Sequence, residues 1–520
     1  MNEFVAKFCI MNFHLMHFII RPFYVLIYRN KPRDIPSIKN PLLKLSATVL
    51  ARKIRNRELS SQAVVEAYIE RIKEVDPFIN AVIEERFEAA LNEAKTCDEK
   101  LKNEEVIALD LEKEKPLYGV PVTMKESMSV KGMSITGGCV KRKGFKAEED
   151  GDAVKLIKNA GAIVLVVSNT SELCTAVNSY NHLFGQTKNP YNRTRTSGGS
   201  SGGEGALIAS GASVLGFGSD IVGSIRIPAL CNGIFGHKPT PGIIPIKGHY
   251  PIMDDENFNN FLVLGPLARY AEDLQLVMKV FTSRLEKPLC FDKPLDLKNL
   301  RIFYVDNFDS FCNMRSATSD IKETIHKALS FFAKNGAYVE HLSQEWIADT
   351  LYMQLSVFGE LDIPELLVDP KNPEGKRRPF LEFAKSLVHL SDYTSTLAFV
   401  RIIIKLHGGI TRSGIESYKN IRTELRHKVN NMLKDDAVFI YPTFPFAATY
   451  PELVFFNFDC SVYSSLANLL HLPSTHIPMG LNNDGLPIGF QVTAASYQDH
   501  LSIGVAKELE KAFGGWIPPS

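Results

Sequence analysis

Two serines and one lysine in this chain have a spacing that could support acyl transfer. Ser200 and Ser224 lie 24 residues apart in a glycine-rich stretch, and Lys125 lies 75 residues before Ser200. Acyl transfer needs an activated nucleophile, a base and N–H groups that face the developing oxyanion. We expect Ser224 to be the nucleophile, Ser200 the proton relay and Lys125 the base.

The serine-glycine stretch at residues 196–228 has other interpretations, and its residues argue against them. A flexible linker does not need the apolar residues that alternate with the glycines between 207 and 221. A phosphate-binding loop requires a lysine in register, whereas Glu204 follows the glycines here. The GGSSG pentapeptide at 198–202 matches a nucleophile elbow, but the preceding residues 192–197 are polar and do not form a buried strand.

The residues around the proposed base and nucleophile fit this chemistry. Lys125 ends the apolar run GVPVTMK at 119–125, where burial would lower its pKa until it accepts a proton. The turn before Ser224 lets the N–H groups of Ile221, Val222 and Gly223 converge on one point with that of Ser224. This turn is our candidate oxyanion hole.

Three motifs resemble the amidase-signature family: KES at 125–127, GGSSGGE at 198–204 and SDIVGSIR at 219–226. The resemblance covers roughly residues 40–520. Within the family, NGIFGHKP at 232–239, GLPIGFQ at 485–491 and the hydrophobic N-terminus are most similar to the fatty-acid amide hydrolases.

The resemblance implies an α/β fold with a large mixed, twisted β-sheet surrounded by helices. It implies a Ser–Ser–Lys relay with a cis peptide before Ser200, a substrate contact at Cys174, and a structural pair formed by Asp220 and Arg226. The implied activity is hydrolysis of amide and ester bonds of lipid-like, long-chain acyl substrates through an acyl-enzyme. It implies no cofactor and no metal, and it is compatible with a homodimer.

The chain departs from the family at Val222, where glycine or alanine is usual. A β-branched residue tolerates positive φ badly. We therefore expect a negative φ at Val222 and an oxyanion loop that still works.

Composition excludes several other classes of protein. A formal net charge of +1 gives no reason to propose nucleic acid as a partner. The eight cysteines contain no C-x-x-C pair, and the thirteen histidines contain no H-E-x-x-H motif. These absences argue against a zinc ribbon, a disulfide framework and a zinc protease site.

The N-terminus, residues 1–34, is predicted to be a membrane anchor, either single-pass or monotopic. Residues 4–28 are mostly apolar and aromatic, although Lys7, Arg21 and Pro22 interrupt them, and basic residues follow at 29–33. No small-residue cleavage site follows. A helix packed on the body and a disordered leader are the alternatives. The apolar run at Leu397 to His407 is either a second membrane contact or a buried helix.

Residues 35–520 contain no convincing linker and are predicted to form one catalytic domain. Apolar periodicity predicts helices within 46–94, with a break at Ser60 and Ser61, and at 152–159, 274–281, 320–334 and 499–513. Buried strands are expected at 118–123, 161–167, 437–441 and 488–493.

Two other functions compete with the hydrolase. One is an amidotransferase subunit of the same family, which the hydrophobic N-terminus disfavours. The other is a catalytically impaired, membrane-anchored binding protein, which Val222 suggests and which intact Lys125, Ser200 and Ser224 oppose.

Overall fold

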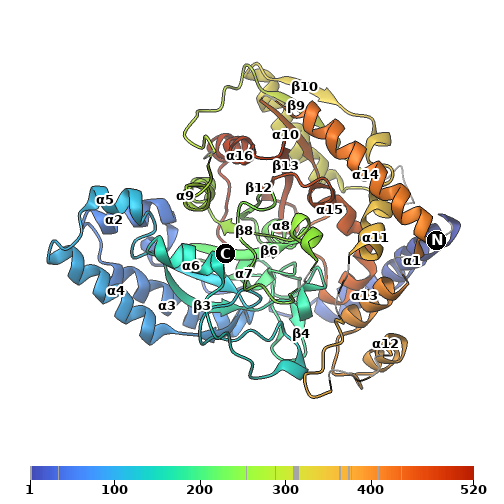
Figure 1. Cartoon of the computed structure of the whole chain (residues 1–520), viewed down its shortest axis with the longest axis horizontal. Coiled ribbons are helices and arrows are strands. Elements are labelled where there is room, and N and C mark those ends of the chain that lie inside the picture. The colour runs from blue at the N-terminus through green and yellow to red at the C-terminus, as the bar shows by residue number, and fades with distance from the viewer. Residues whose placement is uncertain are drawn as a thin grey trace.

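The computed structural model describes residues 3–32, 34–252, 255–286, 289–308, 315–361, 363, 365–372, 375, 378–406, 409–434 and 436–519. Eleven strands of this described part form one mixed sheet that runs through the molecule (Figure 1). In sheet order they are β1 (Val82–Glu85), β3 (Ile163–Ser168), β2 (Pro121–Lys125), β6 (Leu215–Asp220), β8 (Val263–Ala268), β7 (Phe235–Lys238), β12 (Ser474–Leu481), β13 (Pro487–Ala494), β11 (Ala437–Tyr441), β9 (Arg301–Tyr304) and β10 (Tyr338–His341).

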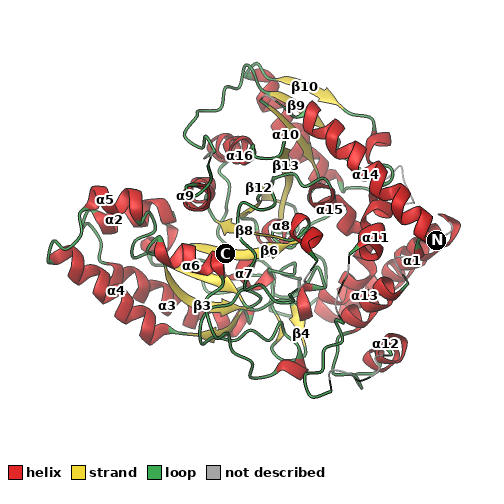
Figure 2. Ribbon diagram, in the orientation of Figure 1, coloured by secondary structure: helices red, strands yellow, loops and turns green. Residues whose placement is uncertain are grey.

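Helices surround this sheet (Figure 2). They are α1 (Glu3–Tyr28), α2 (Ala47–Arg55), α3 (Ser61–Ile79), α4 (Phe87–Lys102), α5 (Ala108–Glu114), α6 (Asp152–Asn159), α7 (Gly202–Ala209), α8 (Arg226–Asn232), α9 (Ala271–Thr282), α10 (Ser319–Lys334), α11 (Thr350–Glu360), α12 (Pro379–Leu387), α13 (Ser395–Lys405), α14 (Arg412–Met432), α15 (Val462–Leu469) and α16 (Asp499–Phe513). Short 3-10 helices and a two-stranded sheet, β4 (Tyr180–Asn181) with β5 (Gly185–Gln186), complete the described elements. The α/β fold with a large mixed sheet is confirmed.

The centre of the sheet mixes both strand directions. Strand β2 pairs in parallel with β3 and with β6, whereas β6 pairs antiparallel with β8. Strands β2, β3 and β6 are buried along their whole length, which agrees with their continuous apolar sequences. Lys125 is the last residue of β2 and Asp220 the last of β6, so the two motifs reach one region of the sheet.

The predicted helices and strands are confirmed with small shifts, except within residues 46–94. The break at Ser60 is present, and its side chain caps α3 by accepting from the Ala63 N–H. The helical segment does not continue to residue 94, because Asn80 takes a left-handed conformation (φ 52°) that ends α3. Residues 82–85 then pair antiparallel with β3 as β1. Four residues are too few for their period to be seen within a longer helical pattern.

Helix α1 packs against the 3-10 helix η7 (Pro451–Ser461). The Phe13 ring lies 5.9 Å from that of Phe455, and Nε2 of His14 lies 3.0 Å from Oδ2 of Asp459. The Tyr28 ring stacks on Tyr450 at 5.3 Å. The N-terminal segment thus takes the predicted alternative of a helix packed on the body.

Among the described residues, none of the helices combines the length and the apolarity that crossing a membrane requires. The expectation of a single-pass anchor is therefore not supported. Charged and polar residues within the apolar run, such as Arg21, account for the difference.

Helix α13 contains the apolar run predicted at 397–407, of which His407 lies outside the described residues. Leu397, Val400 and Ile404 are buried, and Arg401 pairs with Glu365 at 3.0 Å. This face of α13 therefore belongs to the interior, as in the alternative of a buried helix.

Candidate active site

Lys125 and Ser200 are in direct contact inside the protein. The Nζ atom of Lys125 lies 2.7 Å from Oγ of Ser200 and 2.9 Å from Oγ of Ser219, and all three side chains are buried. Burial lowers the pKa of Lys125 below its usual value. A neutral lysine amine in this position can accept a proton from the Ser200 hydroxyl.

The chain around Ser200 is fixed from several sides. The peptide between Gly199 and Ser200 is cis, as expected from the sequence. The Ser179 hydroxyl donates to the Ser200 carbonyl at 3.0 Å and accepts from the Gly202 N–H at 2.7 Å. Ser200 is therefore held at the entrance to α7, with its side chain toward Lys125.

Ser224 lies in the turn between β6 and α8, and a buried ion pair shapes this turn. Asp220 and Arg226 are 3.0 Å apart and fully buried. The Asp220 carboxylate also accepts from the N–H groups of Gly223 at 2.8 Å and Ile225 at 3.1 Å. Although burial favours the neutral acid, Arg226 outweighs it and lowers the pKa of Asp220 to about 2. The expected structural pair is present.

Gly223 carries the positive φ of this turn, at 113°. A Cβ at this position would lie 2.4 Å from Cβ of Ser464, so a larger residue does not fit. Val222 is not among the positive-φ residues of the described chain, which confirms the expectation for that position. The valine is thus accommodated because the glycine next to it takes the unusual angle.

The backbone N–H groups of the turn are divided between two uses. That of Gly223 is taken by Asp220. Those of Ile221, Val222 and Ser224 make no hydrogen bond within the described chain. Three of the four predicted oxyanion donors thus remain available.

The two serines lie on neighbouring loops. The N–H of Ser201 donates to the carbonyl of Ser224 at 3.3 Å. Within the residues that the structure describes, no hydrogen bond joins the hydroxyls of Ser200 and Ser224. The structure thus brings Lys125 and Ser200 into contact and places Ser224 beside them.

Ser219 contacts Lys125 but was not predicted to be part of the site. It belongs to the SDIVGSIR motif and occupies a buried position in β6. The only signal for it in the sequence was that motif, which did not show whether the side chain faces Lys125.

Cys174 lies beside Lys125, and both Cys174 and Ser224 line a large pocket. Burial disfavours the charged thiolate, but Lys125 and His249 outweigh it and lower the pKa of the thiol well below its usual value. Cys174 and Lys125 therefore compete for one proton. An ammonium beside a thiolate cannot act as a base, whereas a neutral amine beside a thiol can.

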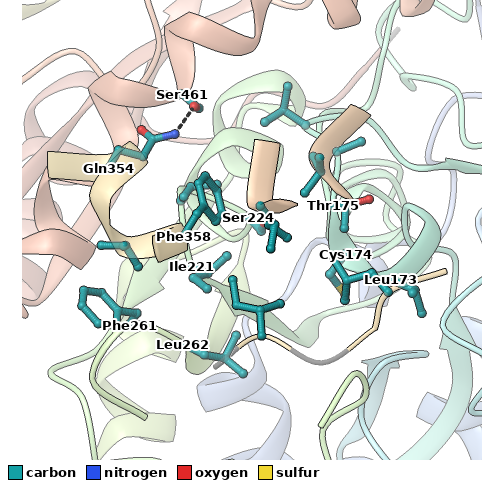
Figure 3. Close-up of a pocket in the computed structure, with 18 of the residues that line it drawn as sticks. Leu173, Cys174, Thr175, Ile221, Ser224, Phe261, Leu262, Gln354, Phe358 and Ser461 are labelled. Carbon is teal, nitrogen blue, oxygen red and sulfur yellow. Dashed lines mark hydrogen bonds between the residues drawn. The ribbon is translucent and has the colours of Figure 1, made fainter. Parts of the chain in front are cut away.

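This pocket is strongly apolar, and Ser224 lies at its wall (Figure 3). Its volume is about 140 Å³. Apolar side chains from α11, α13 and η7 form the part farther along the chain, including Val357, Phe358, Val400, Ile404, Phe455 and Phe458. None of these residues was predicted to belong to the site, because residues 340–460 carry no recognisable motif.

The polar groups of the pocket are few. Gln354 of α11 donates to the Ser461 hydroxyl at 3.0 Å, as Figure 3 shows. Within the described ranges, no group of three histidine, cysteine, aspartate or glutamate side chains could hold a metal ion. The chemistry available at this site is thus that of serine, lysine and cysteine side chains.

Comparison with known proteins gives matches over almost the whole chain. The Amidase family model matches residues 63–502. Fatty-acid amide hydrolase 2-B of Danio rerio is 38% identical over 97% of this chain and 98% of its own length. Fatty-acid amide hydrolase 2 of Homo sapiens is 38% identical over 93% of this chain and 91% of its own length.

A more distant relative belongs to the glutamyl-tRNA(Gln) amidotransferase of Caldanaerobacter subterraneus, at 28% identity over 91% of this chain and 97% of its own length. Among solved structures, a fatty acid amide hydrolase superposes with a TM-score of 0.74 at 23% identity, over 92% of this chain and 86% of that one. This structural likeness supports the fold.

Proposed function

The chain belongs to the amidase family and is an amide hydrolase, and from this premise we propose that it cleaves amide and ester bonds of long-chain acyl substrates through an acyl-enzyme. The observation that carries the proposal is the buried contact between Lys125 and Ser200 beside Ser224, at the wall of an apolar pocket. The 38% identity to the fatty-acid amide hydrolases supports the acyl specificity.

In the proposed mechanism, Ser224 attacks the carbonyl carbon of the substrate. Its proton passes to Ser200 as Ser200 gives its own proton to neutral Lys125. The N–H groups of Ile221, Val222 and Ser224 stabilise the oxyanion, because they are preorganised donors in a site with little water. The relay then returns the proton to the leaving amine or alcohol, and the acyl group stays on Ser224. Water activated by the same relay hydrolyses this ester.

The hydroxyls of Ser200 and Ser224 must come within hydrogen-bond distance for this transfer. Catalytic hydrogen bonds are often long in enzymes without substrate and shorten in the complex. Ser201, bonded to the Ser224 carbonyl at 3.3 Å, keeps the two loops together. A small rotation of the Ser224 side chain is then the only movement that the relay requires.

Labelling with a fluorophosphonate probe, followed by peptide mapping, tests the nucleophile. We expect the label on Ser224 and none in Ser224→Ala, whereas Ser283→Ala, an exposed serine after α9, should label like the wild type. A label on Ser200, or one that survives in Ser224→Ala, would refute the assignment.

A series of amides with acyl chains of increasing length tests the substrate class. Each buried methylene contributes about 0.8 kcal/mol, so kcat/KM should rise about fourfold per carbon until the pocket is full. The matched control is Val400→Ser in α13, which should reduce the gain for long chains and spare short ones. If kcat/KM is independent of chain length, the pocket does not bind the acyl group.

Helix α1 supports a monotopic membrane association. Its inner face contacts the body through Phe13, His14 and Tyr28, whereas its outer face carries exposed apolar side chains, among them Phe18 at 76% and Phe23 at 62% exposure. An apolar face directed outward suits a bilayer surface.

Replacement of Phe18 and Phe23 by serine should move much of the full chain from the membrane fraction to the supernatant while probe labelling continues. Ile107→Ser, at an apolar residue that is 64% exposed elsewhere, is the matched control. Full retention of the double variant on membranes would remove α1 as the contact. The expected homodimer stays a prediction, which sedimentation in detergent can test.

A further inference from the structure

A second, polar cavity of about 190 Å³ lies on the other side of one wall of the apolar pocket. Phe261 and Leu469 line both spaces and separate them. Three cationic side chains line the polar cavity, Lys419, Arg422 and Arg426, all from one face of α14. Glu360 of α11 is the only carboxylate among the described residues that line it, so positive charge is in excess.

Arg422 has an unsatisfied donor in this cavity. The residue is only 6% exposed, and its Nη2 atom donates to Oε2 of Glu360. Its Nη1 atom is buried and has no hydrogen-bond partner in the part of the chain that the structure describes. Buried donors of this kind are almost always paired in proteins. The free Nη1 therefore indicates that something binds here.

His471 supplies a second unsatisfied donor. Its Nδ1 atom must accept, because Nη1 of Arg426 at 2.8 Å can only donate. Burial, with Arg426 next, lowers the pKa of His471 to about 3, so the ring is neutral and its proton is on Nε2. This Nε2 atom is buried and unpaired within the described ranges.

The aromatic wall completes the site. The guanidinium of Arg422 lies 5.1 Å from the ring centre of Phe261, and the His471 ring meets the same phenyl edge-on at 5.2 Å. The ring thus limits how far Arg422 and His471 can move. Both donors are held in place on one side, while Lys419 is exposed at the mouth.

We propose that this cavity binds an oxyanion of a small ligand, either a carboxylate or a phosphate. Arg422 and His471 donate to its oxygens from the floor of the cavity, and Arg426 and Lys419 balance its charge. Planar guanidinium groups match the oxygens of carboxylate and phosphate. The site is distinct from the one at Ser224, since Phe261 and Leu469 lie between them.

Isothermal titration of the full chain with inorganic phosphate, and separately with octanoate, tests the proposal. The reference is sodium chloride at equal ionic strength, because unspecific attraction is screened by any salt. We expect saturable binding of at least one of the two anions. Binding of phosphate alone identifies a phosphate ligand, and binding of octanoate alone identifies a carboxylate ligand.

Variants locate the binding. Arg422→Lys should weaken the affinity about tenfold or more and Lys419→Gln severalfold, because a charge-assisted hydrogen bond or a charge is lost. Arg412→Gln, an exposed cation at the start of the same helix, should bind like the wild type. Octanoate bound in the acyl pocket instead would be insensitive to Lys419→Gln. Absence of binding of both anions, or equal affinity in all three variants, would overturn the proposal.

Discussion

Replacement of Asp220 by asparagine probes how the turn around Ser224 is held. Asp220 is fully buried, pairs with Arg226 at 3.0 Å and accepts from the N–H groups of Gly223 and Ile225. Asparagine has nearly the same shape but presents an NH₂ group where one acceptor was. It leaves Arg226 as a buried charge without its counter-ion.

Two quantities set the size of the expected effect. The pKa of Asp220 lies at about 2 instead of 3.8, and this difference corresponds to roughly 2 kcal/mol in favour of the charged form. Removing one partner of a buried pair costs about 3–5 kcal/mol, because the remaining charge is uncompensated. We therefore expect Asp220→Asn to lower the free energy of unfolding by about 3–5 kcal/mol at pH 7.

Urea unfolding monitored by fluorescence, with Glu149→Gln as the control, measures this change. Glu149 pairs with Lys155 on the surface, so its replacement should leave the midpoint unchanged. The double variant Asp220→Asn with Arg226→Met should recover part of the loss. A loss below about 1 kcal/mol in Asp220→Asn would refute the idea that the pair holds the turn. Because the folded pKa is lowered, this stability is present above pH 3.8 and is lost as the pH falls toward 2.

Three further predictions concern the groups around Ser224. Lys125→Arg should not support turnover, since arginine cannot give up its proton, and activity within tenfold of the wild type would exclude the relay. Cys174→Ala should shift the acid limb of the kcat/KM–pH profile to lower pH, because the thiolate that stabilises the Lys125 ammonium is gone; an unmoved limb would show that the two groups do not share a proton. Gly223→Ala should abolish probe labelling while the chain still folds, since a methyl group there would meet Ser464 and the φ of 113° is strained for alanine. Labelling at the wild-type rate would show that the turn adapts.

The sequence predicted the parts of the site whose function depends on short motifs. Lys125 ends an apolar strand, so its burial followed from its neighbours, and the glycines around Ser200 and Ser224 predicted tight turns. That β2 and β6 pair directly, and so bring Ser219 to Lys125, depends on contacts across the sheet that no local pattern encodes.

The pocket and the N-terminal helix could not be predicted for a different reason. Phe358, Val400 and Phe455 come from segments whose apolar residues would suit any core, and only the tertiary arrangement shows that they surround an open space. Residues 4–28 satisfied the composition of an anchor. Their contacts to η7 depend on residues such as Asp459, more than 400 positions away.

The separation of the pocket from the chemistry has an evolutionary consequence. The reactive side chains come from residues 125–224, close to central strands of the sheet, whereas α11, α13 and η7 supply most of the acyl-facing wall. Insertions or substitutions in 344–461 can therefore change which substrate is accepted without moving Lys125, Ser200 or Ser224. Selection can act on the two regions independently. A chimera that carries this segment from a relative with another substrate should inherit the specificity of its donor and keep the nucleophile of its host.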